Sequence, residues 1–181
     1  LLGILLGIGS SEKLTEFAQN NNTNTNKSFP KKKKSKRIGV SYYNTSYEYP
    51  NDFIVVDLET TGLDVEYDEI IQIAAIKFKE GKEDSRFMLF VKPTIHIPAE
   101  ASRVNQIYDS DVQNAPVINV ALQHFTEFVG DSTLIAHHAS FDMKFLQTFL
   151  TQCGMKTLVN PVIDTLSLAR TFLDLPNYKL T

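Results

Sequence analysis

Short β-branched apolar runs recur from residue 53 onward, and their spacing restricts the fold more than any other feature of the sequence. The run at 53–58 has the length and composition of a buried strand. A second run at 70–78 is separated by a Gly-containing turn from a third run at 86–91. We therefore predict that these three runs form a three-stranded meander.

Strands and helices alternate after the meander. Apolar positions with helical spacing follow Pro116, which suits the first turn of a helix, and Gly130 ends that segment. The later segments are predicted as strand 133–136, helix 141–152, strand 162–163 and helix 165–173, with another helix starting at 177–181. Such alternation predicts an α/β fold with a mixed sheet flanked by helices.

Charge divides the chain at residue 52. Residues 1–51 contain eight Lys and Arg residues and three Glu residues. Residues 52–181 contain ten Lys and Arg residues and eighteen Asp and Glu residues. We interpret residues 1–51 as a disordered linker and residues 52–181 as one domain. The basic run at 31–37 fits a solvated linker or a segment that contacts phosphates or an anionic membrane surface. The acidic domain is not suited to holding nucleic acid by charge alone, although bound metal ions would neutralise its acids.

The chain begins with nine mainly apolar residues and without a methionine. We expect it to start inside a longer reading frame or to be a processed product. Nine residues are too few to cross a bilayer, which takes about twenty in a helix. They fit the end of a membrane anchor and an ordinary apolar segment equally well, so membrane association is not expected but stays open. The single Cys153 fits a reducing compartment, and we expect a cytoplasmic protein.

Two carboxylates end the first predicted strand. Asp57 and Glu59 are two residues apart, and side chains at this spacing point to the same face of a strand. Two anions held together are costly unless a cation lies between them. No His or Cys cluster has the spacing of a zinc site, so the expected ion is Mg²⁺ or Mn²⁺. An ordinary solvated end of a strand is the alternative interpretation.

A third acid, Asp142, lies at the start of the predicted helix that follows the predicted strand at 133–136. A carboxylate in the first turn of a helix is also favourable without any function, because it interacts with the helix dipole. Ligands in α/β sheets gather at the carboxyl ends of strands, and both groups of acids lie at such ends. This coincidence favours a functional site.

These motifs together resemble those of a known enzyme family. The sequence Asp-Leu-Glu-Thr-Thr-Gly at 57–62 and His-His-Ala-Ser-Phe-Asp at 137–142 resembles the DEDD exonucleases of the DEDDh type. The resemblance is strongest to the proofreading epsilon subunit of bacterial DNA polymerase III. Segments 97–107 and 162–170 resemble the family's intermediate landmarks in order and spacing.

The resemblance implies a ribonuclease-H-like fold and removal of nucleotides from the 3′ end of DNA, with RNA as an alternative substrate, in proofreading or DNA repair. Two divalent ions would promote phosphodiester hydrolysis. The implied catalytic and metal-binding residues are Asp57, Glu59 and Asp142. The implied contacts to the terminal nucleotide are Thr60, Thr61, Val104 and Phe141. Single-stranded 3′ ends are the implied substrate, and a DNA polymerase is a candidate partner.

The family's third motif, His-x-x-x-x-Asp, supplies the general base and a last metal ligand. No histidine follows His138 in this sequence, and neither Asp164 nor Asp174 has a histidine five residues before it. We therefore expect the chain to stop before this motif and to be nearly inactive by itself. The earlier segments favour a histidine over a tyrosine in that motif. Asp164 is predicted to end a strand and cap the next helix.

Two departures from the family pattern leave alternatives open. His138 stands where the family usually has Asn, and it could replace the hydrogen bond of that amide or pack against the sheet. Asn105, Gln106 and Ile107 stand where the family has His-Gly-Ile, so nucleotide contacts on that side are uncertain. The alternative function is a catalytically inactive module of the same fold that binds nucleic acid or a protein partner. Retention of three acids argues against it, because polyanion binding gains nothing from carboxylates without metal.

Overall fold

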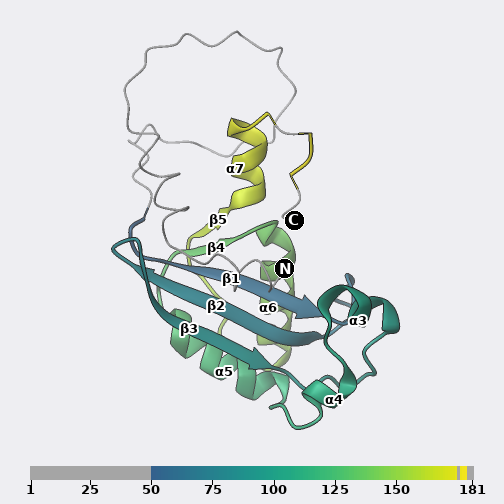
Figure 1. Cartoon of the computed structure of the whole chain (residues 1–181). Helices are drawn as coiled ribbons and strands as arrows, with labels where there is room; N and C mark the ends of the chain where they lie inside the picture. Colours follow the sequence, from purple (N-terminus) through teal and green to yellow (C-terminus); the bar gives the residue numbers. More distant parts are fainter. Residues whose placement is uncertain (1–49, 175, 179–181) are drawn as a thin grey trace, which may run out of the picture.

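The computed structural model describes residues 50–174 and 176–178 (Figure 1). The elements are β1 Phe53–Thr60, β2 Ile70–Lys79, β3 Lys82–Phe90, α3 Ala99–Asn105, α4 Asp109–Val112, α5 Ile118–Val129, β4 Leu134–Ala136, α6 Ala139–Gln152, β5 Val162–Asp164 and α7 Thr165–Phe172. The predicted linker at 1–51, with its basic run, lies outside the described residues except for positions 50 and 51.

Strand β1 lies at the centre of a five-stranded sheet with the order β3-β2-β1-β4-β5. It pairs antiparallel with β2, which pairs antiparallel with β3, while β4 and β5 extend the sheet in parallel. The predicted meander and the mixed α/β sheet are therefore confirmed. Because β1 is hydrogen-bonded along both edges, two registers determine where its side chains lie.

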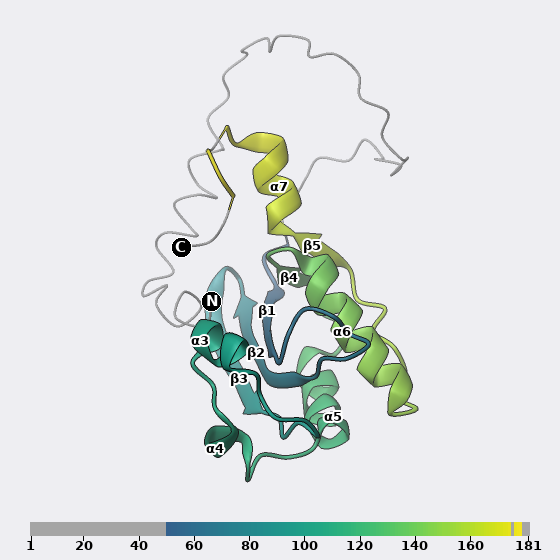
Figure 2. The same ribbon diagram turned by 90° about the vertical axis from the view of Figure 1, so that its right-hand side faces the viewer.

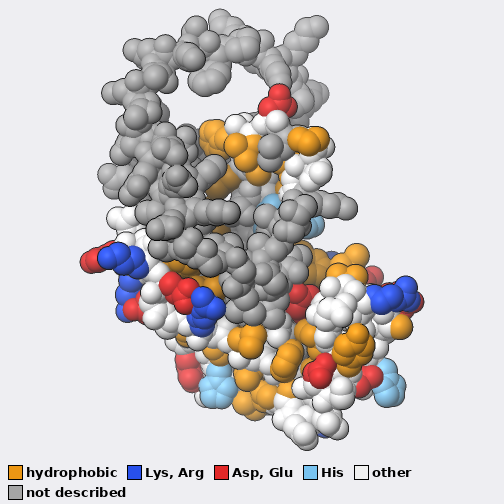
Figure 3. Space-filling view, in the orientation of Figure 1, with side chains coloured by type: hydrophobic (Ala, Val, Ile, Leu, Met, Phe, Trp, Pro, Cys, Tyr) orange, Lys and Arg blue, Asp and Glu red, His pale blue; other side chains and the backbone are white. Residues whose placement is uncertain are grey.

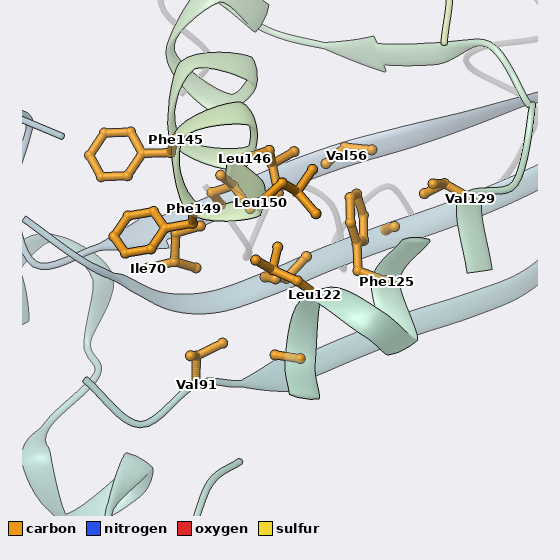
Figure 4. Close-up of a cluster of buried hydrophobic side chains, with 14 of the residues drawn as sticks. Val56, Ile70, Val91, Leu122, Phe125, Val129, Phe145, Leu146, Phe149 and Leu150 are labelled. Atoms are coloured by element: carbon orange, nitrogen blue, oxygen red, sulfur yellow. The ribbon is translucent and has the colours of Figure 1, made fainter. Parts of the chain in front are cut away.

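One face of the sheet is covered by α5 and α6, which lie on the same side of it (Figure 2). Alternate residues of β1 point into this layer, where Ile54 and Val56 are buried. The helices contribute Phe125 and Phe145, which pack with strand side chains in the cluster of Figure 4. Complete burial of one such side chain contributes roughly 1.5–3 kcal/mol. This layer therefore holds in place the strand and the helix that carry the acids.

The short helices α3 and α4 form a second, smaller packing unit. Buried Ile71 of β2 packs there with Ile97, Ile107 and Val112, and Figure 1 shows α3 beside the end of β1. The sequence pattern does not predict these helices, because seven and four residues are too few for helical periodicity to show.

Most boundaries lie within two residues of the prediction, and the largest difference is at β3. Strand β3 begins at Lys82 and not at 86, because a tight turn with positive φ at Glu80 and Gly81 lets pairing resume at once. Helix α5 begins at Ile118, so Pro116 precedes the helix and does not occupy its first turn. These differences at β3 and α5 leave the predicted element types unchanged.

The predicted helix at 177–181 is not supported by its described part. Asn177 and Tyr178 are not helical, and residues 179–181 lie outside the description. None of the helices formed by the described residues is long and apolar enough to cross a membrane.

Candidate active site

Asp57 and Glu59 lie near the carboxyl end of β1. They alternate with the buried residues Ile54, Val56 and Leu58, so their side chains are on the face of the sheet opposite α5 and α6. The pairing with β2 is irregular between Glu59 and Thr60. Irregularities of this kind are frequent beside active sites, where they redirect a side chain.

The third acid reaches the strand through a backbone contact. Asp142 lies in the first turn of α6 and is 4% exposed. Its Oδ1 accepts a hydrogen bond of 3.1 Å from the amide of Leu58, the residue between Asp57 and Glu59. The structure therefore brings together the three acids that the sequence singled out, although Asp142 is more than eighty residues further along the chain.

The electrostatics of the site favour a cation. Burial raises the pKa of Asp142 to about 8, and the nearby charges of Asp57 and Glu59 act in the same direction. Burial also raises the pKa of Asp57 to about 6, against the opposing effect of His137. Asp57 Oδ2 is buried and accepts no hydrogen bond. A divalent ion would both stabilise the ionised carboxylates and give this oxygen a partner.

The side chains would have to move closer to hold an ion. As they are placed, no three His, Cys, Asp or Glu side chains of the described residues are close enough together to enclose one. The three acids are nevertheless close enough for Asp57 and Glu59 to raise the pKa of Asp142. The donor set, three carboxylates, suits a hard divalent ion.

Asp164 holds the start of α6 in position. Its Oδ1 accepts hydrogen bonds from the amides of His138 (2.9 Å), Ala139 (3.4 Å) and Leu166 (3.0 Å). Its Oδ2 accepts one from the hydroxyl of Ser167 (2.8 Å). The prediction that Asp164 caps α7 is confirmed. The same carboxylate also binds the first turn of α6, the helix that carries Asp142.

The structure shows a backbone role for His138. Its side chain is exposed and makes no capping hydrogen bond to α6. Instead, the residue contributes its backbone, which has a φ of 64° and turns the chain from β4 into α6. Left-handed φ values favour Asn over most residues, which explains why an amide residue suits this position.

His137 joins the site to the last described segment. Its Nδ1 lies 3.0 Å from the hydroxyl of Thr165, and its Nε2 lies 2.9 Å from the carbonyl oxygen of Tyr178. A carbonyl oxygen can only accept, so Nε2 carries a proton. His137 is thus oriented by two partners, and its charge lowers the pKa of Asp57 when it is protonated.

The loop after Glu59 is closed by Asp68. Its Oδ1 accepts a hydrogen bond from the hydroxyl of Thr61 (3.0 Å), and its Oδ2 accepts one from the amide of Asp64 (2.8 Å). The same Thr61 oxygen accepts a hydrogen bond of 3.0 Å from the amide of Glu69. The sequence gave no reason to single out Asp68, because its partners are brought to it only by the closed loop.

Gly62→Ala is expected to lower the free energy of unfolding by about 1–3 kcal/mol. An added Cβ would collide with the carboxylate of Asp68, which can move only by giving up its hydrogen bonds to Thr61 and Asp64. In an Asp68→Ala background the same substitution should cost much less. Urea unfolding of the two single variants and the double variant measures this coupling. Equal costs of Gly62→Ala in both backgrounds would contradict the explanation.

The predicted nucleotide-contacting residues differ in their accessibility. Thr60 and Thr61 are buried. The hydroxyl of Thr60 donates a hydrogen bond to the carbonyl oxygen of Gly62, and the hydroxyl of Thr61 donates one to Asp68. Val104 on α3 is 80% exposed. The side-chain amide of its neighbour Asn105 donates to the carbonyl of Thr60 (3.3 Å), which holds α3 against the end of β1. Phe141 is partly buried against the main core.

Comparison with protein families and curated proteins gives consistent matches. The model of the exonuclease family RNase_T matches residues 54–181. The DNA polymerase III PolC-type of Clostridium perfringens is 41% identical over 133 residues, which are 73% of this chain and 9% of that protein. The PolC-type polymerase of Bacillus cereus is 40% identical over 129 residues, 71% of this chain and again 9% of that protein. The chain thus spans about a tenth of the length of these relatives.

Solved structures share the fold. Exonuclease X in complex with 5′ overhanging duplex DNA superposes with a TM-score of 0.57 at 25% identity, covering 70% of this chain and 68% of that one. The zinc-bound form of the E. coli ExoI–ssDNA complex has a TM-score of 0.62 at 16% identity, covering 68% of this chain and 30% of that one. The predicted ribonuclease-H-like α/β fold is therefore confirmed.

Proposed function

Because this chain belongs to the exonuclease family RNase_T, we propose that residues 52–181 form a metal-dependent 3′-5′ exonuclease domain. Its substrate is the 3′ end of a DNA strand, which it shortens by phosphodiester hydrolysis during proofreading or repair. The similarity to PolC-type polymerases and to Exonuclease X in complex with DNA supports DNA over RNA. Residues 1–51 are proposed to be a separate segment outside this domain.

The observation that carries this proposal is the buried, unpartnered Oδ2 of Asp57 in a site with two further acids. Members of the exonuclease family generally use divalent metal ions. We propose two ions, Mg²⁺ or Mn²⁺, with Asp57, Glu59 and Asp142 as their ligands in this chain. When bound, such ions supply an activated water and stabilise the charge that develops on the phosphate and on the leaving 3′ oxygen.

The chain's own residues orient and hold the acids. The amide of Leu58 fixes one oxygen of Asp142, and Asp164 holds the start of the helix that carries it. The raised pKa values of Asp57 and Asp142 mean that ion binding must displace protons near neutral pH. Binding of the ions is therefore expected to strengthen as the pH rises.

Nucleotide binding is proposed to depend on shape and metal more than on surface charge. In the coloured part of the face drawn in Figure 3, basic side chains are scattered among acidic ones and form no continuous patch. The exposed side chain of Val104 and the partly buried ring of Phe141 are proposed to contact the terminal nucleotide. Thr60 and Thr61 would act by shaping the loop, since their hydroxyls are engaged within it.

The proposed partner is a DNA polymerase. The PolC-type relatives are DNA polymerases, and the residues they share with this chain are only 9% of their length. A proofreading domain acts on the strand that a polymerase extends, so physical association would bring the site to the 3′ end.

The test is digestion of a 5′-labelled single-stranded DNA. Residues 1–181 contain no His-x-x-x-x-Asp motif after Asp142, so the assay compares this chain with one extended past Thr181 by a segment that carries the motif. The extended chain is expected to shorten the strand from its 3′ end with Mg²⁺ or Mn²⁺ but not with chelator. Asp57→Ala should abolish the cleavage, whereas Asp131→Ala, at an exposed acid after α5, should not.

Binding separates the proposal from its rival. A catalytically inactive binding module would retain the single strand equally well with ions and with chelator, and it would not be affected by Asp57→Ala. That result, with no cleavage by either chain, would replace the exonuclease proposal with the binding module. Metal-dependent retention of the strand that Asp57→Ala removes supports the exonuclease.

A further inference from the structure

Gln72 is a buried amide in the strand next to the acids. It lies in β2, where its neighbours in sequence are apolar, and only 2% of its surface is exposed. Its side-chain oxygen, Oε1, has no hydrogen-bond partner. A buried carbonyl oxygen without a partner costs about 1–3 kcal/mol, so its presence requires an explanation.

The strand register places Gln72 beside the candidate active site. Gln72 of β2 is directly opposite Glu59 of β1, and Ala74 is directly opposite Asp57. Side chains that are directly opposite in an antiparallel pair lie on the same face, with Cβ atoms about 4.5–5.5 Å apart. Gln72 is therefore on the face that carries the acids, next to Glu59 and diagonal to Asp57.

Two oxygens on this face need the same kind of partner. Within residues 50–174 and 176–178, the only buried side-chain nitrogen or oxygen atoms without a hydrogen bond are Asp57 Oδ2 and Gln72 Oε1. With Asp57 ionised, both are acceptors, so neither can satisfy the other. A hydrated divalent ion would serve both, because the ion attracts the carboxylate and its water molecules donate hydrogen bonds.

We infer that Gln72 is a positioning residue of the metal site, whose Oε1 accepts a hydrogen bond from the hydration shell of the divalent ion held by Asp57, Glu59 and Asp142. This inference rests on the proposed metal-dependent function. An amide suits the position because it adds an acceptor without adding a fourth negative charge to three acids. The lone amide in an apolar strand was the only signal for it in the sequence.

The test compares Gln72→Met with the unchanged chain. Methionine has a similar shape but cannot accept a hydrogen bond of comparable strength. The dissociation constant for Mn²⁺, measured from the electron paramagnetic resonance of the free ion, is expected to rise about tenfold. The free energy of unfolding in chelator is expected to stay unchanged or to rise, because the variant removes an unpartnered buried oxygen. Gln123→Met on the exposed surface of α5 is the matched control and should change neither quantity.

The outcomes are distinguishable. If the unchanged chain binds Mn²⁺ and Gln72→Met binds it equally well, the inference is wrong and the proposed function stands. If the unchanged chain binds no divalent ion, the proposed function fails and the inference fails with it. A second variant, Gln72→Glu, retains an acceptor and is expected to keep the affinity within a few-fold above pH 8. A loss in this variant equal to that in Gln72→Met would also overturn the inference.

Discussion

In the presence of chelator, the free energy of unfolding is expected to fall by several kcal/mol between pH 5 and pH 9, and saturating Mg²⁺ should restore about half of the loss. The cause is the raised pKa of Asp57, to about 6, and of Asp142, to about 8. A carboxyl with a raised pKa in the folded protein stabilises the fold fully only below its ordinary pKa. That contribution is lost as the pH rises through the folded value.

The size of the loss follows from the shifts. Each pKa unit corresponds to about 1.4 kcal/mol, so titration of Asp142 and Asp57 above pH 5 gives a combined loss of roughly 5–6 kcal/mol as an upper limit. Mg²⁺ binds the ionised carboxylates and not the protonated ones, so it opposes the loss. At one hundred times its dissociation constant an ion contributes about 2.7 kcal/mol. Urea unfolding at a series of pH values, with EDTA and with Mg²⁺, measures both effects.

Asp142→Asn is the control for this prediction. Its amide resembles the protonated carboxyl and can still accept the hydrogen bond from Leu58, but it does not ionise. The variant should therefore keep the stability of the unchanged chain at pH 5 and lose much less of it by pH 9. It should also bind Mg²⁺ more weakly. An equal pH dependence in the two proteins would show that Asp142 is not the titrating group.

Asp164→Ala is expected to lower the free energy of unfolding by about 2–4 kcal/mol, because one carboxylate serves the first turns of two helices. It accepts hydrogen bonds from amides of both α6 and α7. Capping interactions of this kind contribute about 1–2 kcal/mol for each helix. Because α6 also carries Asp142, the same variant should weaken Mg²⁺ binding. Chemical unfolding and a metal titration measure the two effects.

Two further variants separate this explanation from a general effect of removing an acid. Asp164→Asn keeps an oxygen that can accept from both helices, so it should cost about 1 kcal/mol or less. Asp111→Ala removes a carboxylate that accepts from the amide of Tyr108 at the start of the four-residue helix α4. Asp111→Ala should lower the free energy of unfolding less than Asp164→Ala does, and it should leave Mg²⁺ binding unchanged. If Asp111→Ala and Asp164→Ala cost the same, the double cap is not the reason.

The pH dependence of Asp164 has the opposite sign to that of the acids at the site. Burial raises its pKa, but hydrogen bonds from Ser167 and from three backbone amides outweigh this and lower the pKa overall. Its contribution to stability is therefore present above its ordinary pKa and lost as the pH falls through the lower folded value. The chain should be destabilised at strongly acidic pH through Asp164 and, in chelator, at alkaline pH through Asp57 and Asp142.

Much of the fold and of the site was predictable because it depends on local patterns. The strands β1, β2 and β4 and the helices α5 and α6 were predicted from apolar spacing, and the structure confirms them. Alternation along a strand was sufficient to place Asp57 and Glu59 on one face. The short helices α3 and α4 and the early start of β3 were missed, because a few residues of helix or polar strand carry no clear periodicity.

The sequence by itself determined the family, the α/β order of elements and the three acids, since these depend on residue types at short spacings. Only the tertiary structure decided that Asp142 reaches the amide of Leu58, that Gln72 lies opposite Glu59, and that Asp164 also binds the start of α6. These contacts join residues that are from about a dozen to more than eighty positions apart. They depend on strand register and helix packing, which also bury Asp57 and Asp142 and so raise the pKa of these two acids.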